Sequence, residues 1–234
     1  MYLFYCPDIE TKQTLSEEES GHCVRVLRYS TGDEILITDG KGTTYTARIT
    51  NPHPKHCDFE IIGREKQEPH HAFHLHIAIA PTKNIERLEW CIEKCVEIGV
   101  DEITPLLCRF SERKQLRTDR LDKIILSAAK QSLTPYLPVL HDLTPFDRFV
   151  KEQAEKDQQC FIAHCYKDDK RELKHEIKQG SDVLVLIGPE GDFSEQEVAE
   201  ALKLGFIPVS LGNSRLRTET AGVVACHTAV LLNS

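Results

Sequence analysis

The pattern of apolar and polar positions divides the chain into two parts. In residues 34–39 and 43–49 apolar and polar side chains alternate around a glycine-containing turn, which predicts a β-hairpin. A further strand is expected at 57–62. Ser16, with Glu19 three residues later, has the spacing of a capping box that begins a short helix through Val26. Several short strands with one helix predict a small β-barrel over residues 1–69.

From about residue 70 the pattern changes to apolar strands that alternate with helices. The polar, proline-containing segment 64–71 marks the boundary. Apolar residues at helical spacing predict a helix that begins near Ile85 and ends at Gly99, and a charged helix is expected over 119–130. Apolar runs predict strands at 74–80, 102–108, 159–165, 182–188 and 206–212. This alternation indicates an α/β domain with a largely parallel sheet over residues 70–234.

Composition restricts the class of protein. A hydrophobic content of 40% and a charged content of 28% are typical of a soluble globular chain. No apolar run approaches the roughly 20 residues that a membrane span requires. The N-terminal residues lack both a basic leader and a long apolar core, so we expect a cytoplasmic protein that is not bound to a membrane. The net charge of −8 argues against indiscriminate binding of nucleic acid.

Positive charge is nevertheless concentrated in one stretch. Between Arg109 and Lys130, seven basic residues stand against three acidic ones, on a chain that is acidic as a whole. Such a stretch is either a solvated helix face or a surface that binds phosphate groups. Both interpretations remain open from charge alone.

The cysteines and histidines do not form a recognisable metal motif. The nine cysteines are odd in number and contain no CxxC pair, so we expect free, mostly buried thiols rather than disulfides or metal ligands. Four histidines lie close together, but their spacing fits no common zinc site. They are His70, His71, His74 and His76. We therefore expect no metal.

Two glycine-containing turns carry the candidate chemistry. The segment 184–198 is a buried strand, a Gly-Pro-Glu-Gly turn and a helix whose start is defined by Ser194 and Glu197. Gly188 and Gly191 remove side chains where the backbone turns sharply and something must approach it closely. The carboxyl end of such a strand is where α/β proteins place ligands.

The second turn lies in the segment 209–232. A strand ends at Gly212, and a polar loop leads to a helix for which Thr218 is the expected N-cap. Small residues early in this helix permit close approach of a ligand or partner, and they are equally common in any tightly packed helix. The helix is apolar around most of its circumference, which favours a second contact surface.

Together these segments resemble one family. GPEGDFS at 188–194, followed by LGNSRLRTETA at 211–221, is similar to the ribosomal RNA small-subunit methyltransferase E (RsmE) family of the SPOUT superfamily. Asp192 stands where the family often has glycine, and residues 213–215 also differ, whereas the core 216–221 is intact. Further matching residues are His22, Val26, Leu27, Arg28, Gly32, Lys83, Trp90, Lys94, Glu97, Gly99, Ala128, Ala129, Gln131 and Ser132.

The resemblance implies a PUA-like RNA-binding barrel at 1–69, followed by a SPOUT methyltransferase domain at 70–234. It implies a deep trefoil knot at about 159–234, an exception to the rule that chains do not thread loops. It also implies a homodimer, in which the apolar helix 218–232 contributes to the interface. The implied donor is S-adenosylmethionine, and the implied acceptor is N3 of a decoding-region uridine in 16S rRNA, within the small ribosomal subunit.

The resemblance also implies site residues. The expected cofactor-binding residues are Leu186, Ile187, Gly188, Pro189, Glu190, Gly191, Leu211, Gly212, Leu216, Arg217, Thr218, Thr220 and Ala221. The expected RNA contacts are Arg25, Arg28, Arg113, Lys114 and Arg117. The expected catalytic residues are Arg217, Glu219 and Glu190.

The roles of the catalytic residues follow from the acceptor. Uridine N3 carries a proton at neutral pH that must be removed. Arg217 keeps its charge, so it suits stabilisation of the anion or a phosphate clamp, while Glu219 or Glu190 could accept the proton. A structural ion pair remains the alternative for each. Two other functions also remain open: a non-catalytic ribosome-assembly factor that keeps the cofactor slot, and a ribose 2′-O-methyltransferase of the same superfamily.

Overall fold

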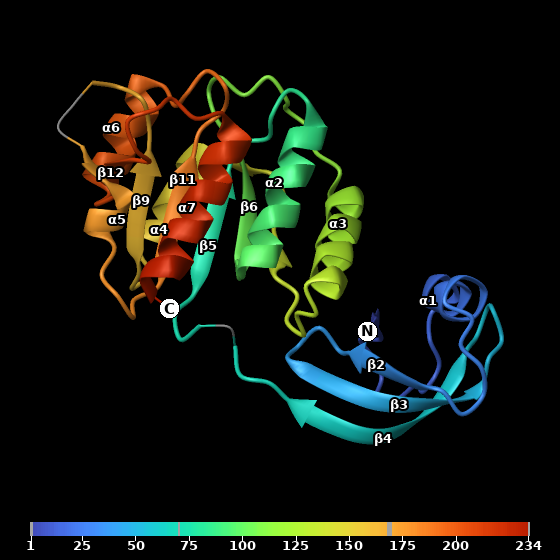
Figure 1. Cartoon of the computed structure of the whole chain (residues 1–234). Coiled ribbons are helices and arrows are strands. Elements are labelled where there is room, and N and C mark those ends of the chain that lie inside the picture. Colours follow the sequence, from blue (N-terminus) through green and yellow to red (C-terminus); the bar gives the residue numbers. More distant parts are fainter. Residues whose placement is uncertain (1, 70, 168–169, 234) are drawn as a thin grey trace. The chain divides into compact units, whose positions relative to one another are not determined.

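The computed structural model describes residues 2–69, 71–167 and 170–233, which form two compact units (Figure 1). The N-terminal unit comprises Met1–Pro69 and Leu126–Leu137, and the C-terminal unit comprises His70–Ile125 and Pro138–Ser234. The segment Leu126–Leu137 therefore belongs to the first unit, although the sequence pattern groups it with the α/β domain. Helix α3 (Thr118–Gln131) contributes residues to both units.

A four-stranded sheet forms the N-terminal unit, in the order β1 (Leu3–Tyr5), β2 (Glu34–Thr38), β3 (Thr43–Asn51) and β4 (Asp58–Lys66). β1 runs parallel to β2, and the other pairs are antiparallel. The predicted hairpin is confirmed as β2 and β3. The strand expected at 57–62 is longer, because β4 continues to pair with β3 as far as Lys66.

The expected short helix is present, but it changes from an α-helix to a π-helix along its length. Ser16 accepts a hydrogen bond from the Glu19 amide at 3.2 Å and begins α1 (Glu17–Gly21). A π-helical turn, His22–Val26, follows directly. Glu19 takes part in the cap through its backbone amide, because its carboxylate forms an ion pair with Lys130.

Hydrogen bonds attach the segment Leu126–Leu137 to the hairpin turn. The Pro135 carbonyl accepts from the Thr38 hydroxyl at 3.0 Å and from the Gly42 amide at 3.1 Å. The Tyr136 hydroxyl donates to the Gln67 carbonyl at 2.8 Å. A Cβ at Gly42 would lie 2.1 Å from the Tyr136 ring, so glycine is required there by the approach of this ring as well as by its φ of +96°.

The C-terminal unit is built on a sheet whose paired strands are all parallel. β11 and β5 lie at its centre and are buried at every residue, as expected for strands covered on both faces. The order is β10 (Arg171–Glu172), β12 (Ile207–Ser210), β9 (Gln159–Ala163), β11 (Val183–Ile187), β5 (Leu75–Ile79), β6 (Glu102–Leu107) and β7 (Val139–Leu140), with β8 (Thr144–Pro145) also beside β6. The predicted α/β class is confirmed, and the knot stays a prediction.

Helices cover both faces of this sheet (Figure 1). α2 (Ile85–Ile98) and α7 (Thr218–Asn233) lie on one face, and α4 (Phe146–Ala154) and α6 (Glu195–Lys203) pack on the other. α5 (Leu173–Glu176) is a single turn. The predicted α2 is confirmed, with the Asn84 side chain at its start and Gly99 in the left-handed conformation at its end.

The remaining expectations concern cysteines and membranes. All nine cysteines are free, and eight of them are buried, as expected. None of the described helices is long and apolar enough to cross a membrane.

The close packing of α7 against α2 and β5 depends on Gly222. A Cβ at this position would lie 2.6 Å from the Cys91 Sγ and 3.0 Å from the Ile79 Cδ1. Both neighbours are 1% exposed, so neither has free space beside it. The small residues of α7 are thus explained in part by helix packing rather than by a ligand.

We predict that Gly222→Ala destabilises the fold. Alanine in a helix interior is normally favoured over glycine by about 1 kcal/mol, whereas overpacking a buried site costs about 1–3 kcal/mol. The net loss should appear as a lower midpoint in urea unfolding. In a double-mutant cycle, Cys91→Ala should reduce the cost of Gly222→Ala, because it removes the clashing Sγ atom. A more stable Gly222→Ala protein would contradict this packing.

Candidate functional site

Three loops at the carboxyl ends of β9, β11 and β12 surround two adjoining hollows of about 440 and 300 Å³. Sites of this size are ordinary for small-molecule ligands. Both hollows are lined by Ala163, Cys165, Arg215, Leu216 and Ala221. The loops therefore form one continuous site at the edge of the sheet where α/β proteins bind ligands.

The larger hollow lies between the end of β9 and the loop after β12. Gly212 opens this loop with a φ of +109°, which side-chain-bearing residues rarely adopt. Among the described residues, no backbone N–H or C=O of 211–216 has a protein hydrogen-bond partner. These groups are thus available to water or to a ligand.

The smaller hollow lies between the Gly-Pro-Glu-Gly turn and the start of α7. Ile187, Gly188 and Pro189 line one side of it, and Arg217 and Thr218 line the other. A Cβ at Gly188 would lie 3.1 Å from the Phe193 ring and from the Phe193 amide nitrogen. The close approach that the sequence predicted at Gly188 is therefore made by the chain itself.

Asp192 holds the turn in place. Its φ of +68° lies in the left-handed region, which explains why glycine is common at this position in the family that the chain resembles. Its carboxylate compensates by accepting hydrogen bonds from the Phe193 amide and the Cys165 amide, each at 2.8 Å. Cys165 is the one exposed cysteine, but partial desolvation of its sulfur, together with the charge of Asp192, raises the pKa of its thiol, so that this thiol stays protonated.

Glu190 and Arg113 hold the loop that follows β5. The Glu190 Oε1 accepts from the Lys83 amide at 2.9 Å, between residues 107 positions apart. The Arg113 guanidinium donates to the carbonyls of Thr82 and Lys83, at 3.2 and 2.9 Å. Both side chains therefore hold the backbone of the loop after β5. The contact of Arg113 with RNA stays a prediction.

The other two predicted catalytic residues lie at the start of α7 in contrasting surroundings. Glu219 is 7% exposed, and its Oε1 lies 3.8 Å from the Arg87 Nε. Its Oε2 is buried without a hydrogen-bond partner among the described residues. Arg217 is exposed, and its guanidinium has no partner within the described ranges. Glu219 therefore offers an unsatisfied acceptor beside the site but lines neither hollow, whereas Arg217 lines the smaller hollow and Arg215, equally exposed and unpaired among the described residues, lines both.

Most of the predicted cofactor residues meet at the two hollows. Ten of the thirteen line them: Ile187, Gly188, Pro189, Glu190, Leu211, Gly212, Leu216, Arg217, Thr218 and Ala221. The Leu186 side chain lies instead in the hydrophobic core, and Gly191 faces the Phe110 Cβ. Thr220 is half-buried on α7 but lines neither hollow.

The predicted cap of α7 is displaced by one residue. Thr218 is the first residue of the helix rather than the residue before it. The first helical hydrogen bond runs from the Ala221 amide to the Arg217 carbonyl, at 2.8 Å. Arg217 thus occupies the position that the sequence assigned to Thr218.

Several lining residues carry no signal that identifies them from sequence. The segment after β9 contributes His164, Cys165, Tyr166 and Lys170, and α2 contributes Arg87. The only available signal is that 159–165 is a predicted strand whose carboxyl end must lie beside those of its parallel neighbours.

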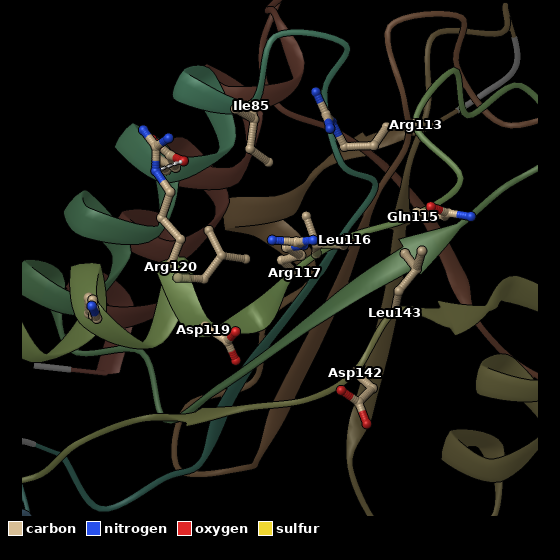
Figure 2. Close-up of a pocket in the computed structure, with 12 residues that line it drawn as sticks. Ile85, Arg113, Gln115, Leu116, Arg117, Asp119, Arg120, Asp142 and Leu143 are labelled. Atoms are coloured by element: carbon tan, nitrogen blue, oxygen red, sulfur yellow. Dashed lines mark hydrogen bonds and ion pairs between the residues drawn. The ribbon is translucent and has the colours of Figure 1, made fainter.

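A third, wider hollow of about 1090 Å³ is rich in basic residues. Figure 2 shows Arg113, Arg117 and Arg120 around it. Arg120 pairs with Glu89 at 2.6 Å, and Arg113 is engaged by the backbone. Within the described residues, the side chains of Lys114, Arg117 and Lys123 have no hydrogen-bond or ion-pair partner and are exposed. Together with Arg109, whose exposed guanidinium also has no partner among the described residues, these three cations form the unpaired part of the basic stretch.

The two arginines predicted to contact RNA in the N-terminal unit are exposed. Arg25 lies in the π-helical turn, and Arg28 follows with a φ of +60°. Val26 and Leu27 between them are also exposed, at 63% and 37%. Irregular helical turns of this kind often occur at functional sites.

Comparisons with known proteins identify an RNA methyltransferase domain and a PUA domain in this chain. A family model for an RNA methyltransferase domain matches residues 69–230, and one for an RNA methyltransferase PUA domain matches residues 15–62. Ribosomal RNA small subunit methyltransferase E of Mesomycoplasma hyopneumoniae is 32% identical over 175 residues, covering 70% of this chain and 72% of that protein.

Two solved structures share the whole fold. A probable rRNA-methyltransferase from Porphyromonas gingivalis matches with a TM-score of 0.93 and 43% identity, covering 99% of both chains. Ribosomal RNA small subunit methyltransferase E from Neisseria gonorrhoeae, bound to S-adenosyl methionine, matches with a TM-score of 0.88 and 26% identity, covering 100% of this chain and 98% of that one.

We predict that Asp192→Gly is more stable than Asp192→Ala, by about 1–2 kcal/mol, because both lose the carboxylate but only alanine keeps the left-handed strain. The measurement is urea unfolding of the two variants beside the native protein. Equal stabilities would mean that the turn relaxes out of the left-handed conformation when the carboxylate is absent.

Proposed function

The chain belongs to the ribosomal RNA small subunit methyltransferase E family, and from this premise we propose that it methylates N3 of a decoding-region uridine in 16S rRNA, with S-adenosylmethionine as donor. The observation that carries this proposal is the pair of adjoining hollows formed by the Gly-Pro-Glu-Gly turn and the loop 211–216 at the carboxyl edge of the sheet. The proposed acceptor is a base of the small ribosomal subunit, and the proposed location is the cytoplasm.

The residues around the hollows fit this cofactor. Ile187, Leu216 and Ala221 supply apolar walls, and the unpaired backbone groups of 211–216 supply donors and acceptors for an adenine ring. The smaller hollow is lined by two carboxylates, Glu190 and Asp192, and by three arginines, Arg87, Arg215 and Arg217, so groups of both signs are available to the charged parts of the cofactor. The bound cofactor would supply a sulfonium methyl group that needs no activation, so the protein's task is alignment, and the transfer itself requires no metal.

Removal of the uridine proton is the step that needs a protein group. Of the two candidate acceptors, Glu190 lines the smaller hollow and Glu219 lies beside it at the start of α7, but only Glu219 has a buried oxygen, Oε2, without a hydrogen-bond partner among the described residues. Glu190 already uses one oxygen to hold the Lys83 amide. We therefore propose that Glu219 accepts the N3 proton, directly or through a water molecule, and that Glu190 positions the loop.

Arg217 is proposed to stabilise the anion that forms as N3 loses its proton. It lines the smaller hollow, is exposed, and has no partner within the described ranges. Its permanent charge and planar guanidinium suit an anion spread over the base oxygens. Because that charge develops only during the reaction, the interaction would lower the barrier rather than tighten ground-state binding.

RNA binding is proposed for both units. In the C-terminal unit it would use the unpaired cations Lys114, Arg117 and Lys123, and in the N-terminal unit Arg25 and Arg28. Phosphate contacts made by such residues are attractive at low salt and weaken as salt rises. Local charge of this kind allows an acidic protein to bind RNA.

A homodimer is proposed, with α7 in its interface. Only part of this helix is used by packing within the chain, since Val223 and Val224 remain half-buried and Leu231 is 62% exposed. A second copy of the chain would cover this apolar surface.

The test of the proposed function is methylation of small ribosomal subunits that lack the modification, followed by nuclease digestion and mass analysis of the nucleosides. N3-methyluridine is the expected product. A 2′-O-methylated nucleoside would favour the ribose methyltransferase alternative. Binding of cofactor and subunits without any methyl transfer would favour the assembly factor.

We predict that Arg217→Ala binds cofactor nearly normally but transfers methyl groups about 100- to 1000-fold more slowly, the usual cost of losing one such donor. Single-turnover methylation at saturating cofactor and RNA measures the rate, and separate titrations measure binding. Arg217→Lys should recover little, because a point charge lacks the planar geometry. Arg148→Ala, on α4, is the matched control. A native rate for Arg217→Ala would remove this residue from the chemistry, and a loss of cofactor binding would make it a binding residue.

We predict that replacing Lys114, Arg117 and Lys123 with alanine flattens the salt dependence of RNA binding. If each cation contacts one phosphate of a single strand, the slope of log affinity against log salt should fall by about 2. A control variant loses the same charge elsewhere, at Arg148, Lys151 and Lys203. An unchanged slope in the first variant would show that these three cations are only a solvated surface.

We predict that the native protein is a dimer in light scattering at micromolar concentration and that Leu231→Glu shifts it towards monomer, because the substitution places a charge in the apolar contact. Leu202→Glu, at an exposed leucine of α6, is the control and should leave the mass unchanged. A native monomer would contradict the proposed interface.

A further inference from the structure

Three side chains with metal-binding chemistry meet at the edge of the sheet opposite the cofactor loops. His76 is the second residue of β5, Glu102 is the first residue of β6, and His141 directly follows β7. The strands are parallel, with His76 opposite Glu102 and Glu102 opposite Val139. The starts of β5 and β6 and the end of the two-residue strand β7 therefore lie together, although the residues are far apart in the sequence.

The distances between their donor atoms suit a metal ion. The Glu102 Oε2 lies 3.4 Å from the His76 Nδ1 and 3.0 Å from the His141 Nε2. All three ligand atoms lie within 4.8 Å of one another. Ligand atoms about 2.0–2.1 Å from a tetrahedral zinc ion are separated by about 3.3–3.4 Å, so two of the three spacings are already near the required values.

Neighbouring groups orient these ligands. The His76 Nε2 lies 2.8 Å from the Thr104 Oγ1, so donation of its N–H to this hydroxyl would leave Nδ1 free to bind a metal. The His74 Nε2 lies 3.3 Å from the second oxygen of Glu102 and holds that carboxylate from the other side. The Phe149 ring packs edge-on against the His76 ring, with 5.5 Å between the centroids. Supporting contacts of this kind accompany histidine ligands in metal sites.

One of the three ligands is buried, and another is partly exposed to solvent. His76 is 2% exposed, whereas the His141 side chain is 41% exposed. An ion could therefore enter from solvent beside His141 and keep a water molecule as its fourth ligand. His71 takes no part, because its two ring nitrogens are hydrogen-bonded to the carbonyls of Phe73 and Gly99, each at 2.6 Å.

We propose that His76, Glu102 and His141 bind one divalent ion, with zinc as the best match. Two imidazoles and one carboxylate are a donor set that late first-row metals prefer, and that magnesium and calcium do not. The spacing of the neighbouring histidines alone predicts no metal, since two of the three ligands lie far away in sequence. The ion would link β5, β6 and the end of β7 and stabilise this edge of the sheet, separately from methyl transfer.

The test uses the full chain without an affinity tag, stripped of metal. Zinc is titrated calorimetrically in the presence of a competing chelator, and cobalt is added to a second sample for its visible spectrum. We expect one high-affinity site per chain, the intense absorption of four-coordinate cobalt, and a zinc-dependent rise in the melting temperature. Absence of a one-to-one zinc site in the native protein would overturn the proposal.

Variants assign the site. His141→Asn should weaken zinc binding more than about 100-fold, since even a supporting residue typically costs 10- to 100-fold, and Thr104→Val should fall within that lower range. Because His141 is partly exposed, the metal-free variant should melt near the native temperature. The matched control replaces His53 and His56, an exposed stacked pair, with asparagine and should keep the high-affinity site. Native affinity in His141→Asn, or loss of the site in the control, would show that the three residues form only a hydrogen-bonded cluster.

Discussion

The parallel arrangement of the C-terminal sheet is the constraint on which the rest depends. Because β5 and β11 are buried on both faces, polar chemistry is confined to the two edges where strands begin and end. At the carboxyl edge, the turns after β9, β11 and β12 form the two hollows proposed to bind the cofactor. At the amino edge, the starts of β5 and β6 and the end of the short β7 bring two histidines and a glutamate together.

Hydrogen bonds to carboxylates hold the loops around the two hollows in place. Asp192 joins the Gly-Pro-Glu-Gly turn to the segment after β9, Glu190 joins it to the loop after β5, and Glu197 accepts from the Arg109 amide while completing the capping box of α6. These bonds connect segments that the sequence separates widely, so the site is held before any ligand binds. A site held in this way loses little entropy on binding and suits a reaction that depends on alignment.

The distribution of charged side chains fits the proposed binding of RNA by an acidic protein. In the basic stretch, the side chains of Arg113, Arg120 and Lys130 are engaged by protein groups, which leaves those of Arg109, Lys114, Arg117 and Lys123 available to phosphates. At the cofactor site Arg217 is likewise left without a partner among the described residues. The proposed functional cations are thus those that the fold does not use for its own stability.

Local pattern by itself determined several helices, strands and turns. The β2–β3 hairpin, α2 with its end at Gly99, and the capping box at Ser194 depend on residues close together in the chain, so periodicity and caps suffice to predict them. Only the tertiary structure decided that Gly188 accommodates Phe193, that Leu126–Leu137 joins the N-terminal unit, and that Glu102 meets His76 and His141. The physical reason is that a side chain's partner is chosen by contacts between distant segments, which no local pattern encodes.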